Sequence, residues 1–186
     1  MANVNNKNQA DGRFDKTPNL KLNGMKITMR NFRGQDYGYN PTHKRTFWLL
    51  LDPERFDIQA MQDDGWNIKE IQKREGHEDD PTMYRLDVEM RWDNFPPVIH
   101  MVTKKDNGRF KRTLMTEKSA ELFDSAEIVN VNLEISHGRT WFMNGKYGIK
   151  AYLKKAQIEV VTDDFDTYYD FDDEDVFGDN DDVPFE

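Results

Sequence analysis

The chain has 186 residues, of which 37% are hydrophobic and 33% charged, and its net charge is −9. It contains no cysteine, which excludes disulfides, a thiol nucleophile and a cysteine-ligated zinc site, and is compatible with a reducing cytoplasm. No apolar run approaches the roughly 18 residues that cross a bilayer, and the first residues lack the apolar stretch of a signal peptide. We therefore expect a soluble, intracellular protein.

Charge is unevenly distributed along the chain. Residues 163–186 hold 12 of the 35 acidic side chains, six aromatic residues and no Lys or Arg, whereas residues 1–162 hold all 26 basic residues and carry a net charge of +3. Polar and strongly charged segments cannot bury enough apolar surface to offset chain entropy. We therefore predict a disordered leader over 1–19, one domain over 20–162 and a disordered acidic tail over 163–186.

Alternation of apolar and polar residues predicts strands at 25–31, 45–52, 66–71, 85–92, 98–103, 127–136 and 147–161. Two short helices are expected between them. Asp52-Pro53 supplies a cap and a first-turn proline for one that ends before Gly65, and the other covers 116–123. Asn144-Gly145 is typical of the tight turn of a β-hairpin.

The last predicted strand changes the face that carries its apolar residues. Ile149, Ala151 and Leu153 occupy odd positions, whereas Ala156, Ile158 and Val160 occupy even ones. A β-bulge at Lys154-Lys155 would produce this change, and bulges bend strands at barrel corners. The pattern predicts an all-β domain built as a small closed or partly closed barrel. A strand interrupted by a loop, and an open sandwich, are the alternatives.

Three groups of basic and aromatic residues suggest a surface for single-stranded nucleic acid, because unpaired bases stack on aromatic rings and phosphates attract Lys and Arg. The first lies on the polar face of the last strand and the preceding turn and comprises Lys146, Tyr147, Lys150, Tyr152 and Lys154. The second, predicted to be a flexible loop, comprises Lys104, Lys105, Arg109, Phe110, Lys111 and Arg112. The third lies between the first two strands and comprises Arg30, Arg33, Tyr37, Tyr39, Lys44 and Arg45. Ordinary solvated surface is the alternative for each group.

Motifs for catalysis are weak by comparison. Asp87 and Glu89 share one strand face and could hold Mg²⁺ for phosphodiester cleavage, but Arg85 and Arg91 on that face favour a ladder of surface ion pairs. The four histidines have no metal-ligand spacing, and neither a phosphate-binding Gly-Lys motif nor a nucleophile elbow is present. We expect no catalytic residue, metal or cofactor.

Four segments resemble the single-stranded DNA-binding proteins of tailed bacteriophages: residues 30–34 (RNFRG), 64–69 (DGWNIK), 93–97 (DNFPP) and 144–154 (NGKYGIKAYLK). The resemblance implies an OB-fold body that coats single-stranded DNA during phage replication and recombination. The chain end also resembles the acidic tip of bacterial single-stranded DNA-binding proteins, through Asp181, Asp182, Val183, Pro184 and Phe185. That implies recruitment of replication or recombination proteins, although Glu186 follows the phenylalanine and departs from the pattern.

The leading hypothesis is therefore a non-enzymatic protein that binds single-stranded DNA with little sequence preference. Its tail imitates the charge and the stackable rings of a single strand, so we expect the tail to compete with DNA for the basic surface. A Mg²⁺-dependent nuclease using Asp87 and Glu89 is one alternative. A DNA-mimicking inhibitor that acts through the acidic tail is another.

Overall fold

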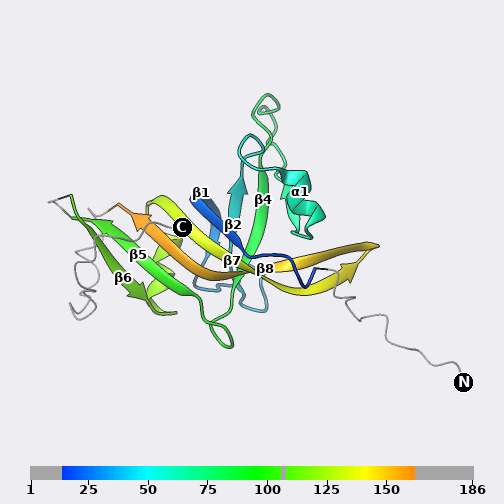
Figure 1. Ribbon diagram of the computed structural model, residues 1–186. Coiled ribbons are helices and arrows are strands. Elements are labelled where there is room, and N and C mark those ends of the chain that lie inside the picture. The colour runs from blue at the N-terminus through cyan, green and yellow to red at the C-terminus, as the bar shows by residue number, and fades with distance from the viewer. Residues whose placement is uncertain (1–13, 106–107, 162–186) are drawn as a thin grey trace, which may run out of the picture.

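The computed structural model describes residues 14–105 and 108–161, so the predicted tail and most of the predicted leader lie outside the described residues. The described residues form eight strands and two short helices (Figure 1). In chain order these are β1 (Leu20–Asn31), β2 (Arg45–Leu51), α1 (Ile58–Asp63), β3 (Ile68–Glu70), β4 (Tyr84–Met90), β5 (Val98–Lys104), β6 (Phe110–Met115), the 3₁₀ helix η1 (Ser119–Asp124), β7 (Ile128–Met143) and β8 (Lys146–Val160).

Five strands close a barrel in the order β1, β2, β4, β8, β7. β1 pairs with β2 and with β7, β2 pairs with β4, and β7 pairs with β8, all antiparallel. The ring closes where β8 runs parallel to β4, with Val88 opposite Ala151 and Glu89 opposite Tyr152. A five-stranded barrel of this kind is the architecture of OB-like folds. The predicted small barrel is confirmed, and the open sandwich is wrong.

The barrel core is filled by alternate residues of its strands. Leu49, Val88 and Ile135, which come from three different strands, are completely buried. Where η1 covers the barrel, the ring of Phe123 packs on that of Phe32, with the two centroids 5.4 Å apart. The ring of Phe32 in turn stacks on Phe47 at 5.8 Å. The short helix thus completes the core and anchors the segment that follows β1.

The change of face in β8 is a bulge, as predicted. Leu153 and Ala156 are buried, and the two lysines between them are exposed. The pairing with β7 shifts at the same point, from Leu153 opposite Ile135 to Lys155 opposite Glu134. Before the bulge β8 pairs with β4, and after it β8 pairs in parallel with β5. One strand therefore belongs both to the barrel and to the sheet that extends from it.

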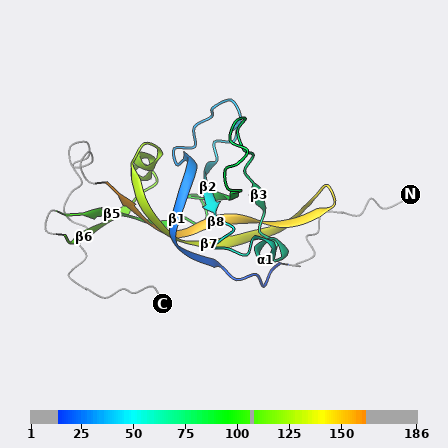
Figure 2. The same cartoon turned by 90° about the horizontal axis from the view of Figure 1, so that it is seen from above.

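Two hairpins extend from the barrel in opposite directions, and both views show them at opposite ends of the molecule (Figures 1 and 2). The β7–β8 hairpin turns at Asn144-Gly145, whose φ angles of 53° and 78° confirm the predicted tight turn. The β5–β6 hairpin contains one strand, β6, that was not among the predicted strands. The prediction of a flexible loop through Arg112 is wrong from residue 110 onward, because Thr113 and Met115 are buried and alternate with exposed Arg112 and Leu114.

The predicted helices are shorter than expected. α1 begins at Ile58, and its N-cap is Asp57, whose carboxylate accepts a 3.0 Å hydrogen bond from the backbone N–H of Ala60. Asp52 instead closes the preceding turn, by accepting from the backbone N–H of Glu54 at 2.9 Å. Gly65 follows the helix with a φ of 95°, as expected of a stop. The second predicted helix is η1, displaced by a few residues.

The part of the predicted leader that the structure describes lies against the barrel. Phe14 packs on the core and against Gly65, where a Cβ atom would collide with its ring. The Thr17 hydroxyl donates to the carbonyl oxygen of Asp64 at 2.9 Å, and the amide of Asn19 donates to Glu134 at 2.8 Å. None of the helices in residues 14–105 and 108–161 is long and apolar enough to span a membrane.

Asp124 should contribute measurably to stability. Its carboxylate accepts from the backbone N–H groups of Phe32 at 2.6 Å and Arg33 at 3.1 Å, which ties η1 to the end of β1. Asp124→Ala leaves both donors without this partner and should reduce the free energy of unfolding by about 1–3 kcal/mol. Tryptophan fluorescence in a urea titration measures the change.

The matched control is Asp36→Ala, since the Asp36 carboxylate also accepts from two backbone N–H groups, of Gly38 and Asn40, but in an exposed loop. Water can replace those bonds, so the loss should be smaller. Equal losses for the two variants would contradict an anchoring role for Asp124.

Candidate nucleic-acid interface

Residues from two of the three predicted clusters meet in one cavity of about 530 Å³ on the side of the barrel. We call it the barrel groove. Its lining comes from the segment that leads into β2, the end of β4, the segment just before η1, and β8. The lining residues are Thr42, His43, Lys44, Arg45, Glu89, Met90, Arg91, Trp92, Asp93, Glu117, Lys150 and Tyr152. The groove therefore combines cations with aromatic rings, the two requirements of a single-strand site.

Strand register explains why these residues meet. Glu89 of β4 lies opposite Thr46 of β2 on one side and Tyr152 of β8 on the other, so the outward faces of three strands are adjacent. The guanidinium carbon of Arg91 lies 5.5 Å from the centre of the Tyr152 ring. On the neighbouring strand stands Gly138, where a Cβ atom would collide with that ring. The glycine thus makes room for the tyrosine on the barrel surface.

Most of the cations in and beside the barrel groove form ion pairs with carboxylates. Lys150 Nζ lies 3.6 Å from Glu89, and Arg45 lies 2.9 Å from Glu117. Lys154 Nζ donates a 2.7 Å hydrogen bond to Glu134, and this bond holds the pKa of Glu134 below its usual range. A phosphate that binds here competes with these carboxylates, so the arrangement favours binding that is sensitive to salt.

The proposed magnesium ligands are engaged by cations. The Asp87 carboxylate lies 3.0 Å from Lys69 and 3.5 Å from Arg85, and Glu89 is paired with Lys150. In the part of the chain that the structure describes, no three His, Asp or Glu side chains are placed to share a metal ion. The ladder of ion pairs is present, although Lys150 rather than Arg91 is the partner of Glu89.

The three predicted clusters include no tryptophan. Trp92 lines the groove, and Trp48 lies half-buried on the outer face of β2, with the guanidinium carbon of Arg85 only 3.4 Å from its ring centre. The available signal was the alternation of Trp48 with buried Phe47 and Leu49, which places the indole on the outer face.

The cluster between β1 and β2 is divided by the fold. Arg30 donates a 2.7 Å hydrogen bond to the carbonyl oxygen of Ala126, and burial lowers the pKa of the Arg30 guanidinium. Arg33 lies 3.9 Å from both Glu121 and Asp124, so the structure places these two arginines against η1 and its following turn and not in the groove. Tyr37 and Tyr39 are 51% and 71% exposed, and their stacked rings have centroids 6.0 Å apart.

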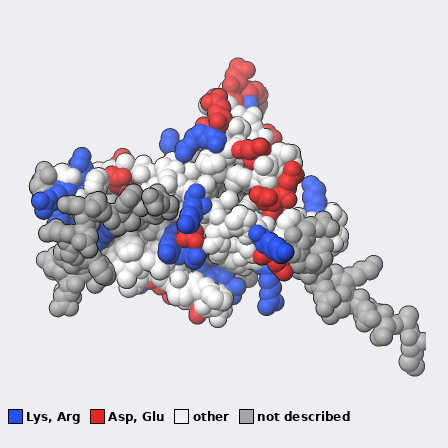
Figure 3. Space-filling model, viewed as in Figure 1, with Lys and Arg blue, Asp and Glu red and all other residues white. Residues whose placement is uncertain are grey.

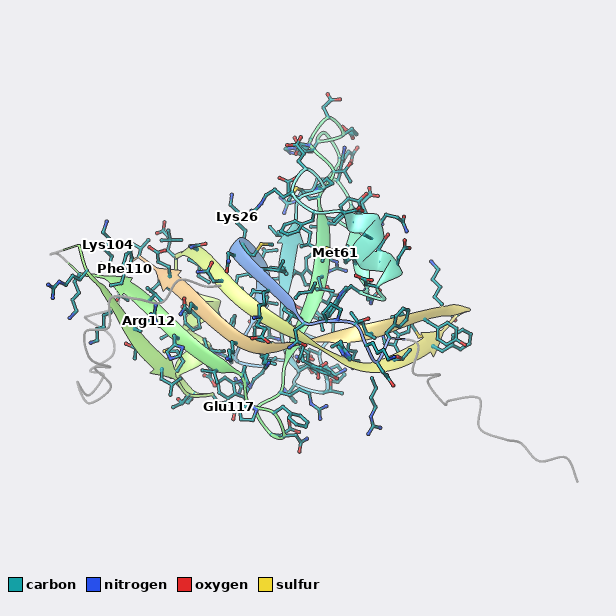
Figure 4. The ribbon with its side chains drawn as sticks, viewed as in Figure 1. Lys26, Met61, Lys104, Phe110, Arg112 and Glu117 are labelled. Carbon is teal, nitrogen blue, oxygen red and sulfur yellow. The ribbon has the colours of Figure 1, made fainter. Side chains whose placement is uncertain are left out.

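The remaining predicted residues lie on the two hairpins. Figure 4 shows Lys104, Phe110 and Arg112 together on the β5–β6 hairpin, away from Glu117 at the groove. Lys146 and Tyr147 lie at the opposite end, where the ring of Tyr147 contacts that of Phe142 at 4.5 Å. On the face in Figure 3, basic side chains gather at the β5–β6 end, whereas acidic ones gather over α1 and the β3–β4 loop.

A model of the family described as "Putative phage ssDNA-binding domain" matches residues 10–182. Two solved structures are similar: the single-stranded DNA-binding protein from bacteriophage Enc34, with 12% identity, 77% of this chain and 81% of that chain covered and a TM-score of 0.46, and a C-terminal truncation of the same protein, with 12% identity, 78% and 87% covered and a TM-score of 0.48. No curated protein matches. The family match spans the whole barrel and confirms the resemblance noted in the sequence, so the chain belongs to the phage single-stranded DNA-binding domain family.

Proposed function

We propose that this protein binds and protects single-stranded DNA, without strong sequence preference and without a catalytic step, during phage DNA replication or recombination. The observation that carries the proposal is the barrel groove, where Tyr152 and Trp92 lie among Lys44, Arg91 and Lys150. Bases stack on aromatic rings and phosphates attract cations, and the groove presents both on one open surface. The chain's membership of this family agrees with that use of the groove.

The composition of the groove also supports tolerance of sequence. Every base has a π face, so stacking on an aromatic ring discriminates little between bases, and Lys or Arg contacts to phosphate carry no base information. The polar face of β8 extends this surface in both directions. It runs from Lys146 at one hairpin tip, past Tyr152, to Lys155 beside β5. We infer that the bound DNA strand follows β8 and meets the cations of the β5–β6 hairpin where β8 ends.

Incubating labelled single strands with the protein and Mg²⁺ tests this function. Retained, intact strands are the expected result. Fragments would instead support a nuclease that uses Asp87 and Glu89. A lack of binding, both by the full chain and by a chain without residues 163–186, would support an inhibitor that acts through its tail. Titration of the intrinsic tryptophan fluorescence with oligonucleotides of increasing length gives the number of nucleotides bound.

Removal of the Tyr152 ring should weaken binding. Tyr152→Ala should cost about 1–3 kcal/mol of binding free energy if one base stacks on this ring. Tyr152→Phe retains the ring and serves as the matched control, with affinity close to that of the original protein. Fluorescence titrations of the folded variants provide the comparison. Unchanged affinity in Tyr152→Ala would remove this face of β8 from the binding site.

We also propose that the acidic tail competes with DNA for the basic surface. β8 ends with Val160 opposite Thr103 of β5, so the chain enters the tail beside the β5–β6 hairpin and its cations. DNA binding would then release the tail, whose tip offers Asp181, Asp182, Val183, Pro184 and Phe185 to a replication or recombination protein. The aspartates would attract a basic pocket and the Phe185 ring would fill an apolar one.

A further inference from the structure

Two glycines of the β7–β8 hairpin each lie beneath an aromatic ring. A Cβ atom on Gly138 of β7 would collide with the ring of Tyr152. In the same way, a Cβ atom on Gly148 of β8 would collide with the ring of Trp141. Gly148, Lys150 and Tyr152 are alternate residues of β8, so they share one side of the hairpin. Both rings therefore lie on the side that continues the outer face of the barrel.

Trp141 has no role in the interior of the protein. Its side chain is half-buried, and among the described residues it lies outside the hydrophobic core. A glycine weakens the interior of a strand and often marks a place where a ligand approaches closely. Two such glycines under two rings, on the same side of one hairpin, give a surface on which flat groups can stack.

A β-bulge brings cations to the level between the two rings. The pairing of β7 with β8 shifts here, so that Gly138 and Arg139 together lie opposite Lys150 alone. Arg139 is exposed and, within residues 14–105 and 108–161, forms no ion pair. Residues 137–150 contain three Lys or Arg and no Asp or Glu. A phosphate can therefore bind Arg139 without displacing a carboxylate, unlike at the paired cations of the groove.

We propose that this side of the hairpin is a second nucleotide-binding subsite, in which a base stacks on Trp141 and Arg139 contacts a phosphate. The proposal rests on the proposed function. Trp141 lies opposite Gly148, four residues along β8 from Tyr152. At the rise of a strand this is about 13 Å, too far for both rings to stack on one base. A bound strand thus leaves the groove along the hairpin, which extends away from the barrel (Figures 1 and 2).

The opposite side of the hairpin provides the control. Phe142 and Tyr147 are paired across the two strands, and the centres of their rings are 4.5 Å apart. Phe142 follows Trp141 in β7, so its side chain points to the other side of the hairpin. Phe142 is also 53% exposed and thus more accessible than Trp141. If exposure alone determined which ring binds DNA, Phe142 would be the more important of the two.

Substitutions on the two sides test the subsite. Trp141→Ala should weaken binding to a long oligo(dT) about 5- to 150-fold, through the loss of one base stack. Trp141→Phe retains a ring and should recover most of the affinity, and Phe142→Ala should bind like the original protein. Arg139→Gln should lower the log–log salt slope by about 0.7, through the loss of one phosphate contact. Fluorescence anisotropy of a labelled oligonucleotide measures each value.

Oligonucleotide length separates the hairpin subsite from the groove. An oligo(dT) too short to extend beyond the groove does not meet Trp141, so Trp141→Ala and the original protein should bind it equally. Tyr152→Ala should weaken binding at every length. If the loss in Trp141→Ala is the same at every length, the substitution has damaged the groove and the hairpin subsite is contradicted.

Fluorine NMR of the protein with fluorinated tryptophan tests the contact without an alanine variant. The signal of Trp141 is identified by its absence from Trp141→Phe, and it should shift when long oligo(dT) is added. Trp66, which is 2% exposed in the core, is the internal control and its signal should stay in place. A Trp141 signal that does not move in the DNA complex would overturn the proposal.

Two further results would count against the subsite. One is that Trp141→Ala binds long oligo(dT) as tightly as the original protein, and the other is that Phe142→Ala alone loses affinity. In both cases the original protein still binds DNA, so the proposed function stands. If the original protein binds no oligonucleotide of any length, it is the proposed function that fails.

Discussion

Alanine at the five cations of the β5–β6 hairpin should flatten the salt dependence of single-stranded DNA binding by up to about 3.5 in log–log slope, since each neutralised phosphate contributes about 0.7. The cations are Lys104, Lys105, Arg109, Lys111 and Arg112. A change of this size also means a large loss of affinity at low salt and a small one at high salt. Fluorescence titrations at several salt concentrations measure the slope.

The outer side of the β5–β6 hairpin should account for most of the change in slope. Arg112 is exposed on the same side of β6 as Phe110, whereas Lys111 is half-buried. The control is Lys73→Ala with Arg74→Ala in the acidic β3–β4 loop, and that variant should keep the original slope. An unaltered slope in the five-alanine variant would show that this hairpin contacts no phosphate.

Deletion of residues 163–186 should tighten DNA binding, most at low salt. A tethered tail has an effective concentration of about 1 mM. If its intrinsic dissociation constant for the basic surface is about 0.1 mM, only about one molecule in eleven has that surface open, and truncation tightens binding about tenfold. The gain should shrink as the Debye length falls from about 30 Å at 0.01 M salt to about 8 Å at 0.15 M.

A tail of the same length with its 12 carboxylates replaced by amides is the matched control. It keeps the aromatic rings and the bulk of the segment, so it separates charge from steric exclusion, and it should bind DNA nearly as tightly as the truncated chain. A second deletion, of 181–186 alone, removes three of the carboxylates and should abolish partner recruitment while most of the competition remains. Competition by the tail is contradicted if the chain without 163–186 binds DNA no more tightly at 0.01 M salt.

Features encoded by neighbouring residues were readable from the sequence. The bulge in β8 follows from the switch of Leu153 and Ala156 between odd and even positions, because each side of a strand takes every second residue. The β7–β8 turn follows from Asn144-Gly145, since a tight hairpin requires two positive φ values. The bulge, together with the dominance of strands, indicated a small barrel, because one bulged strand can belong to two parts of such a barrel.

Other features depend on contacts between segments that are distant in sequence. β6 was missed because its neighbours are mostly polar, and its inward face becomes evident only where it pairs with β5. Arg30 and Arg33 belong to the same basic and aromatic cluster in the sequence as Lys44. Only their packing against η1 and the turn that follows it separates the two arginines from the groove.

The groove itself depends on pairing between strands that are distant in sequence. The parallel pairing of β4 with β8 brings Glu89, Arg91 and Tyr152 together, although more than 60 residues separate β4 from that part of β8. Strand periodicity and turn chemistry are local, so they were enough to predict a barrel with aromatic residues on its strand faces. Which of those faces meet to form a site was determined by barrel closure, because that depends on long-range strand register.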